Sequence, residues 1–258
     1  MKLHSKISGS GRPMLIMHGL FGSGDNWYTV GNVLAKEGFE VHLLDLRNHG
    51  RSPHDPVFNY TVMAEDLQEY ISGNSLMDPV LIGHSMGGKT VLKHAQKYPD
   101  EASARIIVDI APRGFDVRHM DVVEALQSVD FNAHTTRKSV ETVMREHLDD
   151  EGNVQFLLKN LYWKTDQQLA WRFALDFIVA SIHEVGARID FECSSEMSIL
   201  FVRGALSDYV TDEDVVSIQH KCPQARFVNI HGAGHRVHID KPQEFISSVL
   251  HFLANKKP

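Results

Sequence analysis

The stretch GHSMGGKT, residues 83–90, satisfies two unrelated patterns, and the fold and chemistry of the chain depend on which of them applies. Read as G-x-x-x-x-G-K-[ST], it is a phosphate-binding P-loop. Read as G-x-S-x-G, it is a nucleophile elbow in which Ser85 attacks an acyl group. Both patterns need a strand before the turn and a helix after it. The apolar run 79–82 and the helical pattern that stops before Pro99 supply both, so distant residues must decide.

The P-loop alternative would use Lys89 and Thr90 for phosphate and Asp109, at the end of a β-branched strand, for magnesium. Only 19 positions separate Thr90 from Asp109, which leaves room for one helix and one turn. This alternative also leaves three signals without a role: His18-Gly19, the polar loop 45–52, and the sequence Gly-Ala-Gly-His at 232–235. A nucleophile elbow explains all three. Lys89 and Thr90 are then expected to be ordinary first-turn helix residues.

Length and charge limit the classes of protein to consider. At 258 residues the chain fits one α/β domain, 1–258, and its net charge of −7 argues against nucleic acid or an anionic membrane as a partner. The first residues lack the apolar core of a signal peptide, and no apolar run approaches the ~18 to 20 residues of a membrane span. We therefore expect a cytoplasmic protein with a small-molecule partner, in which Cys193 and Cys222 are reduced thiols. The sequence carries no signal for the oligomeric state.

Short apolar runs alternate with helical patterns along the chain. The runs are 14–17, 41–44, 80–82, 106–110, 199–202 and 227–230. This alternation predicts an α/β fold with a mostly parallel central sheet and helices on both faces.

The regular alternation breaks between the fourth and fifth runs, where 113–195 reads as helices. The expected helices are 121–126, 139–148, 154–162 and 169–182. An insertion at this place predicts a helical lid over the strand ends. Its apolar residues are expected to shape an acyl pocket: Phe156, Leu157, Leu161, Trp163 and Trp171. The alternative is that these residues only hold the lid helices together.

Acyl transfer by a serine needs a base, an orienting acid and donors for the oxyanion. Ser85 is the expected nucleophile, and the N–H of Met86, at the start of the following helix, is the first expected oxyanion donor. The second is the N–H of Leu20, in a tight glycine-containing turn after the first central strand. His235 is the expected base, because the small residues 232–234 let a loop carry its imidazole over the edge of the sheet.

Two aspartates are candidates for the orienting acid. Asp208 follows the penultimate strand, where this chemistry most often draws its carboxylate, and its alternative role is to cap the next helix. Asp109 ends the strand after the nucleophile strand, and its alternative role is to anchor neighbouring loops. A carboxylate at a buried strand end is costly unless it is paired, so Asp109 is expected to have a partner.

Three histidines near the C-terminus, His231, His235 and His238, invite comparison with a metal site. Their glycine-rich spacing does not place them on one face, and no H-E-x-x-H motif accompanies them. We therefore expect no metal, with His231 and His238 exposed or packed. The loop 45–52 is expected to brace the oxyanion loop, with direct contact to substrate as the alternative.

Together, these motifs resemble the α/β-hydrolase superfamily, and within it small bacterial esterases of the YbfF type. The motifs are His18-Gly19-Leu20-Phe21-Gly22, D-x-R-N-H-G-x-S at 45–52, the elbow at 83–89, Asp109-Ile110-Ala111-Pro112, Gln155-Phe156-Leu157-Leu158-Lys159 and Gly232-Ala233-Gly234-His235.

The resemblance implies the α/β-hydrolase fold, with a helical lid after the sixth strand. It also implies a serine esterase for short- to medium-chain acyl esters, with action on acyl-CoA thioesters as a further possibility, a pocket that includes Phe21, and no cofactor. Relatives of this type carry the Asp109 signature and often lack a carboxylate at the Asp208 position, which favours Asp109 although this chain has both. A non-catalytic binding protein with the same fold is the remaining alternative, and the complete set of serine, histidine and acid disfavours it.

Overall fold

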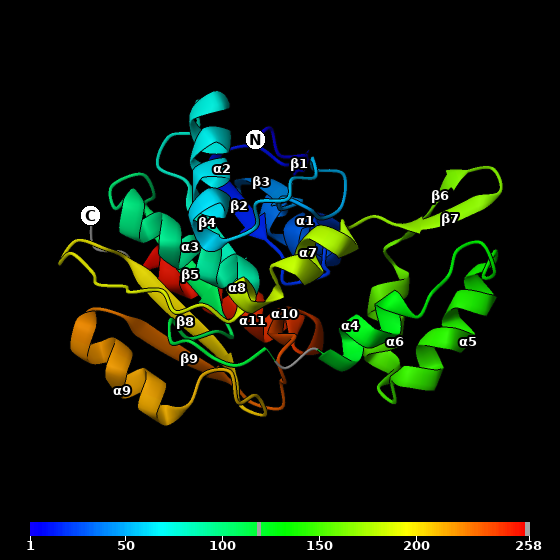
Figure 1. Ribbon diagram of the computed structural model, residues 1–258. Coiled ribbons are helices and arrows are strands. Elements are labelled where there is room, and N and C mark those ends of the chain that lie inside the picture. Colours follow the sequence, from blue (N-terminus) through cyan, green and yellow to red (C-terminus); the bar gives the residue numbers. More distant parts are fainter. Residues whose placement is uncertain (118–119, 256–258) are drawn as a thin grey trace.

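Seven strands form the central sheet of the computed structural model, which describes residues 1–117 and 120–255 (Figure 1). Their order is β1-β3-β2-β4-β5-β8-β9. The bounds are β1 Ser5–Ser8, β2 Arg12–Met17, β3 Phe39–Leu44, β4 Val80–His84, β5 Ala104–Val108, β8 Ile199–Gly204 and β9 Arg226–Ile230. All neighbouring strands are parallel except β1, which runs antiparallel to β3.

The six strands predicted from apolar runs are therefore confirmed, and β1 is the one that was missed. Its sequence SKIS has a single large apolar side chain, Ile7, which is 56% exposed. An edge strand of this kind carries no burial pattern in its sequence, because only one of its sides pairs with the sheet.

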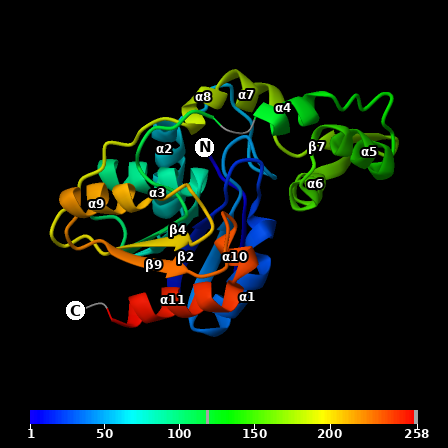
Figure 2. The same cartoon turned by 90° about the horizontal axis from the view of Figure 1, so that it is seen from below.

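Helices cover both faces of the sheet, as predicted (Figure 2). One face holds α1 and α11, and the other holds α2, α3 and α9. The bounds of these helices are α1 Tyr28–Lys36, α2 Tyr60–Gly73, α3 Met86–Lys97, α9 Asp212–Lys221 and α11 Pro242–Ala254; the short helices η1 Gly24–Trp27 and α10 Val237–Asp240 precede α1 and α11. The central strands β4 and β5 are buried along their whole length, which is why their sequences are largely apolar runs rather than alternating ones.

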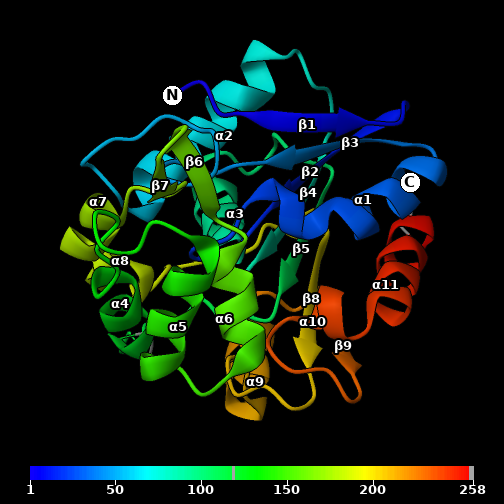
Figure 3. The same cartoon turned by 90° about the vertical axis from the view of Figure 1, so that its right-hand side faces the viewer.

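The inserted segment between β5 and β8 stands beside the sheet (Figures 1 and 3). It contains α4 Met120–Gln127, α5 Arg137–His147, α6 Glu151–Leu158, β6 Leu161–Thr165, β7 Gln168–Trp171, α7 Leu175–Ala180 and α8 Ile182–Val185. It follows the fifth strand of this chain, not the sixth. The predicted helix 169–182 is wrong in its first part, because Leu169 and Trp171 lie in an antiparallel hairpin of β6 with β7. Aromatic and β-branched residues such as Tyr162, Trp163 and Thr165 favour strands.

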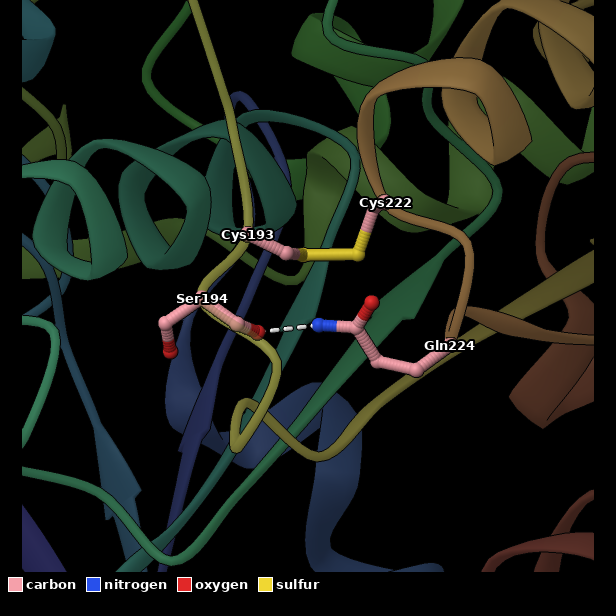
Figure 4. The surroundings of a disulfide bond; sticks show 4 residues. All are labelled: Cys193, Ser194, Cys222 and Gln224. Carbon is pink, nitrogen blue, oxygen red and sulfur yellow. Dashed lines mark hydrogen bonds between the residues drawn. A yellow bond between two sulfur atoms is a disulfide. The ribbon is translucent and has the colours of Figure 1, made fainter.

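The expectation of two free thiols is also wrong, since Cys193 and Cys222 form a disulfide bond with Cα atoms 4.9 Å apart (Figure 4). The bond joins the extended chain before β8 to the C-terminus of α9, and beside it the Gln224 amide donates to the Ser194 carbonyl. Disulfides persist mainly in oxidising compartments, so the cysteines give no support to a reducing one. Within residues 1–117 and 120–255, no helix has the length and apolar character needed to cross a bilayer.

Candidate active site

The carboxyl ends of the parallel strands meet at one edge of the sheet, where α/β proteins bind their ligands. The residues that follow five of these strands include His18 after β2, Ser85 after β4, Asp109 after β5, Ser207 after β8 and His235 after β9. The fold thus gathers at one edge residues that lie up to 217 positions apart, from 18 to 235.

Ser85 lies on the sharp turn between β4 and α3, with φ 51° and ψ −115°. This left-handed backbone is unfavourable for a residue with a Cβ, and such strain clusters at functional sites. The turn is possible because Gly83 and Gly87 meet backbone to backbone: a Cβ on Gly83 would lie 2.2 Å from the Gly87 carbonyl oxygen. The local geometry is that of a nucleophile elbow.

Asp109 and His235 are joined directly. The His235 Nδ1 atom lies 2.8 Å from Asp109 Oδ2, and the Asp109 side chain is fully buried. The buried carboxylate also accepts hydrogen bonds from the Gly204 N–H, at 2.9 Å, and from the Ser207 hydroxyl. An ionised Asp109 requires the proton of His235 to be on Nδ1, which leaves Nε2 as an acceptor.

Asp208, the other candidate acid, has an exposed side chain, and its backbone carbonyl lies 3.5 Å from the Arg113 guanidinium. The segment that carries it does contribute to the site through its neighbour Ser207, which holds the Asp109 carboxylate. A serine in a turn carries no distinguishing signal in the sequence, so this role was not predicted. The structure therefore favours Asp109 for the contact with His235.

Two aromatic side chains hold His235 in place. Tyr209 stacks on the imidazole with ring centroids 3.9 Å apart, and His84 Nε2 lies 2.8 Å from the His235 carbonyl oxygen. Burial lowers the pKa of His84 well below its usual value, so this imidazole is neutral. Ser85 and His235 line the same cavity without a hydrogen bond between them, a contact that often tightens only when substrate is bound.

The expected oxyanion loop lies against the elbow. A Cβ on Gly19 would lie 3.0 Å from His84 Nδ1 and 3.4 Å from the Ser85 Cβ, so the loop packs closely against the elbow. Neither the Leu20 N–H nor the Met86 N–H donates a hydrogen bond to another residue in the described part of the chain. Met86 directly follows Ser85, and Leu20 directly follows Gly19, so both N–H groups belong to residues next to the elbow and are candidates to bind an oxyanion.

The loop 45–52 braces this region, as predicted. The Leu46 N–H donates to His18 Nε2 at 3.0 Å, and the Phe21 N–H donates to His49 Nε2 at 3.1 Å. Burial lowers the pKa of His49 to about 3, which keeps its Nε2 lone pair available as the acceptor.

A cavity of about 390 Å³ opens at Ser85 and His235. Phe21, Phe156 and Leu157, three of the residues predicted to contact the acyl group, line it. Leu161 and Trp163 do not: Leu161 is buried at the base of the β6–β7 hairpin, and Trp163, further along it, is 53% exposed. The predicted helix 154–162 ends at Leu158 in the structure, and Leu161 and Trp163 lie in β6 instead. Trp171, also on the hairpin, packs against Phe173 instead.

Arg236, the residue after His235, also lines the cavity and was not predicted. Its guanidinium donates to the Gly152 carbonyl at the start of α6, at 3.1 Å. Asp150, Asn153 and Asp240 add polar groups to the same lining. The lining therefore combines apolar side chains with polar groups, some of them at the start of α6.

Lys89 and Thr90 are unavailable to a phosphate. The Lys89 ammonium is buried and donates to the backbone carbonyls of Arg113 and Ala187 at 2.9 and 2.6 Å, and burial lowers its pKa to about 7. The Thr90 hydroxyl donates to the Met86 carbonyl within α3. These contacts, and the bond of Asp109 to His235, leave the P-loop interpretation without support.

The C-terminal histidines do not gather around a common point. His231 is exposed, whereas His238 is buried and stacks on Trp27 with ring centroids 3.7 Å apart. Burial lowers the pKa of His238 to about 3. Among the residues that the structure describes, no group of three or more His, Cys, Asp or Glu side chains is placed to hold a metal ion.

Comparison with known proteins agrees with this geometry. A family model described as alpha/beta hydrolase fold matches residues 12–151. The chain is 35% identical to "Esterase YbfF" of Escherichia coli, over 93% of this chain and 92% of the relative. It is 34% identical to "sn-1-specific diacylglycerol lipase ABHD11" of Danio rerio, over 95% of this chain and 79% of the relative.

A solved structure, "Marine microorganism esterase", has a TM-score of 0.94 and 40% identity, and the match covers 98% of this chain and 99% of that one. The family and the enzyme class expected from the motifs are both borne out. The chain belongs to the alpha/beta hydrolase fold family and is a carboxylic ester hydrolase.

Proposed function

We propose that the protein is a serine esterase that cleaves short- to medium-chain acyl esters through an acyl-enzyme on Ser85. The observation that carries the proposal is the 2.8 Å contact of His235 Nδ1 with the buried Asp109 carboxylate, at the sheet edge where Ser85 lies in its strained turn. This is the arrangement in which one imidazole nitrogen is oriented and the other can take a proton.

In the first half of the reaction, Ser85 Oγ attacks the carbonyl carbon of the ester while His235 Nε2 takes the hydroxyl proton. The negative charge that forms on the carbonyl oxygen is bound by the N–H groups of Leu20 and Met86, and the dipole of α3 adds to this stabilisation. The tetrahedral intermediate then collapses, and the leaving alcohol takes its proton from His235.

In the second half, His235 removes a proton from water, which attacks the acyl-Ser85 carbonyl carbon. The same N–H groups bind the oxyanion, and collapse returns the proton to Ser85 and releases the carboxylic acid. Asp109 stays ionised throughout and stabilises the imidazolium that forms in each half.

The substrate class follows from the cavity. Its volume of about 390 Å³ is near the lower end for small-molecule sites, and Phe21, Phe156 and Leu157 offer apolar contacts for an acyl chain. We propose that the inserted segment 113–195 acts as a lid that completes this pocket, because Phe156 and Leu157 come from α6. The acyl half of a thioester would make the same contacts, so acyl-CoA is a secondary candidate substrate.

The test is intact mass after incubation with a fluorophosphonate, together with hydrolysis of 4-nitrophenyl esters of two to twelve carbons. We expect one adduct on the wild type and none on Ser85→Ala, with hydrolysis lost by at least ~10⁴-fold in the variant and its fold unchanged by circular dichroism. A Ser85→Ala protein that keeps most of its activity, or a wild type that neither reacts nor hydrolyses, would refute the proposal.

A further inference from the structure

The turn that carries the Leu20 N–H is held by hydrogen bonds on three consecutive peptide groups. The Gly19 carbonyl accepts from the Gly22 N–H at 3.0 Å and from His18 Nδ1 at 2.8 Å. A peptide group is planar and trans, so its N–H points away from its C=O. Fixing the Gly19 carbonyl therefore fixes the direction in which the Leu20 N–H points.

The next two peptide groups, on either side of the Phe21 Cα, are held by two different parts of the chain. The Phe21 N–H donates to His49 Nε2, from the loop 45–52. The Phe21 carbonyl accepts from the Asn160 amide at 2.8 Å, across 139 positions of sequence. Phe21 has φ 56°, a conformation that is unfavourable for a non-glycine residue and persists only when its surroundings impose it. These two bonds are among the contacts that impose it.

Asn160 belongs to the inserted segment and lies between α6 and β6. It is 3% exposed, and its own backbone is anchored at both groups: its N–H donates to the Leu157 carbonyl, and its carbonyl accepts from the Arg172 N–H, both at 2.9 Å. The amide is thus a rigid donor whose position is set by α6 and the hairpin. Phe173 of the same segment packs on the Phe21 ring, with centroids 5.1 Å apart.

We propose that Asn160 is a positioning residue that sets the Leu20 N–H for oxyanion binding, so that the inserted segment is part of the catalytic apparatus as well as the wall of the acyl pocket. This inference rests on the proposed function, because it assigns to Leu20 the oxyanion of the Ser85 reaction. It predicts that displacement of the inserted segment lowers the rate of the chemical step even for substrates too small to touch Phe156 or Leu157.

The test compares Asn160→Ala with Tyr60→Phe, using 4-nitrophenyl acetate and a trifluoromethyl ketone that forms a tetrahedral adduct with an active-site serine. The control is matched, because the Tyr60 hydroxyl also makes one buried bond between the sheet side and the inserted segment, to the Val185 carbonyl at 2.8 Å, but does not touch the oxyanion loop. For Asn160→Ala we expect kcat to fall about 10- to 100-fold with KM within about threefold, since loss of a whole oxyanion donor costs ~10² to 10³.

Affinity for the ketone should fall by the same factor as kcat/KM, because the adduct mimics the transition state. The pH profile of kcat/KM should keep its shape, because His235 and Asp109 are untouched. Tyr60→Phe should change none of these quantities by more than about threefold. A folded Asn160→Ala protein with wild-type kcat, or one whose losses equal those of Tyr60→Phe, would overturn the proposal.

Asn160→Ser is the second variant, for the case in which alanine prevents folding. Its shorter polar side chain cannot span the distance to the Phe21 carbonyl. We expect the same fall in kcat and in affinity for the ketone as for Asn160→Ala, and the same results would contradict the proposal. Failure of the proposed function itself is distinguishable, because it would appear as a wild type that neither hydrolyses the ester nor binds the ketone.

Discussion

The two candidate acids differ in burial: the Asp109 side chain is buried and the Asp208 side chain is exposed. Asp109 is fully buried at a strand end with φ 50°, and it accepts hydrogen bonds from a backbone N–H, a hydroxyl and an imidazole. Asp208 lies one residue beyond Ser207 with an exposed side chain. A buried carboxylate with three hydrogen-bond donors is held in one place, which is what an orienting acid needs.

Asp109→Asn should therefore lower kcat by about 10³- to 10⁴-fold, because an amide at this position favours the wrong tautomer of His235. Asp208→Asn should leave kcat within about threefold of the wild type. Steady-state kinetics on a 4-nitrophenyl ester, with circular dichroism to verify the fold of both variants, decides the matter. A large loss in Asp208→Asn alone would move the role to that residue.

At the scale of elements, helix α6 and the β6–β7 hairpin of the inserted segment differ in their relation to the cavity. Phe156 and Leu157, on α6, face the cavity, whereas Trp163 lies on the hairpin and is half exposed. The α6 side chains therefore line the cavity, and Trp163 does not. The hairpin contributes instead through its base, where Arg172 and Asn160 meet.

Phe156→Ala should change the preference for acyl length, since removal of the ring enlarges the pocket and takes away apolar contact. We expect kcat/KM for an eight-carbon ester, relative to acetate, to change about 10-fold or more, the effect of ~1.4 kcal/mol in differential binding. Trp163→Ala is the control, with an expected change below about threefold. Equal effects of the two substitutions would contradict the assignment of the pocket to α6.

At the scale of the whole molecule, several histidines are buried in neutral form. Burial lowers the pKa of His18, His49, His84, His94 and His238. When such a residue is exposed by unfolding, its pKa returns to about 6.5 and it gains a proton below that pH. The unfolded chain then binds more protons than the folded one, so the free energy of unfolding falls as the pH drops from about 6.5 toward 3.

His94 on α3 isolates this effect away from the active site. It is fully buried, contacts Gln68 at 2.9 Å, and burial, with the nearby Arg105 charge, lowers its pKa to about 3. Between pH 7 and pH 5 this one residue should account for about 2 kcal/mol of lost stability, from the difference between the folded and unfolded pKa values.

His94→Gln, which keeps a polar partner for Gln68, should therefore lose about 2 kcal/mol less than the wild type over the same pH range. Urea unfolding followed by fluorescence at pH 7, 6 and 5 measures the difference. Parallel stability curves for the two proteins would show that His94 does not contribute to the acid sensitivity.

The strands, the elbow and two members of the candidate site were predictable because their signals are local. A buried parallel strand needs a continuous apolar run, and a sharp strand-to-helix turn needs small residues around Ser85, so each appears in a few consecutive letters. His235 is recognisable for the same reason, since a glycine-rich loop precedes it. Errors occurred where the local pattern had two solutions: residues 161–171 suit a hairpin as well as a helix, and Ser5–Ser8 pairs at an edge without being buried.

The sequence by itself determined which side chains can do the chemistry, and the tertiary structure decided which of them meet. Asp109 reaches His235 because β5 lies next to β8 and β8 next to β9, an order that no stretch of sequence states. Tertiary packing also places Lys89 under backbone carbonyls of the inserted segment, brings Cys193 to Cys222, and sets Asn160 against Phe21. Local patterns report burial and turn geometry along the chain, whereas contacts over a hundred positions depend on how the layers pack.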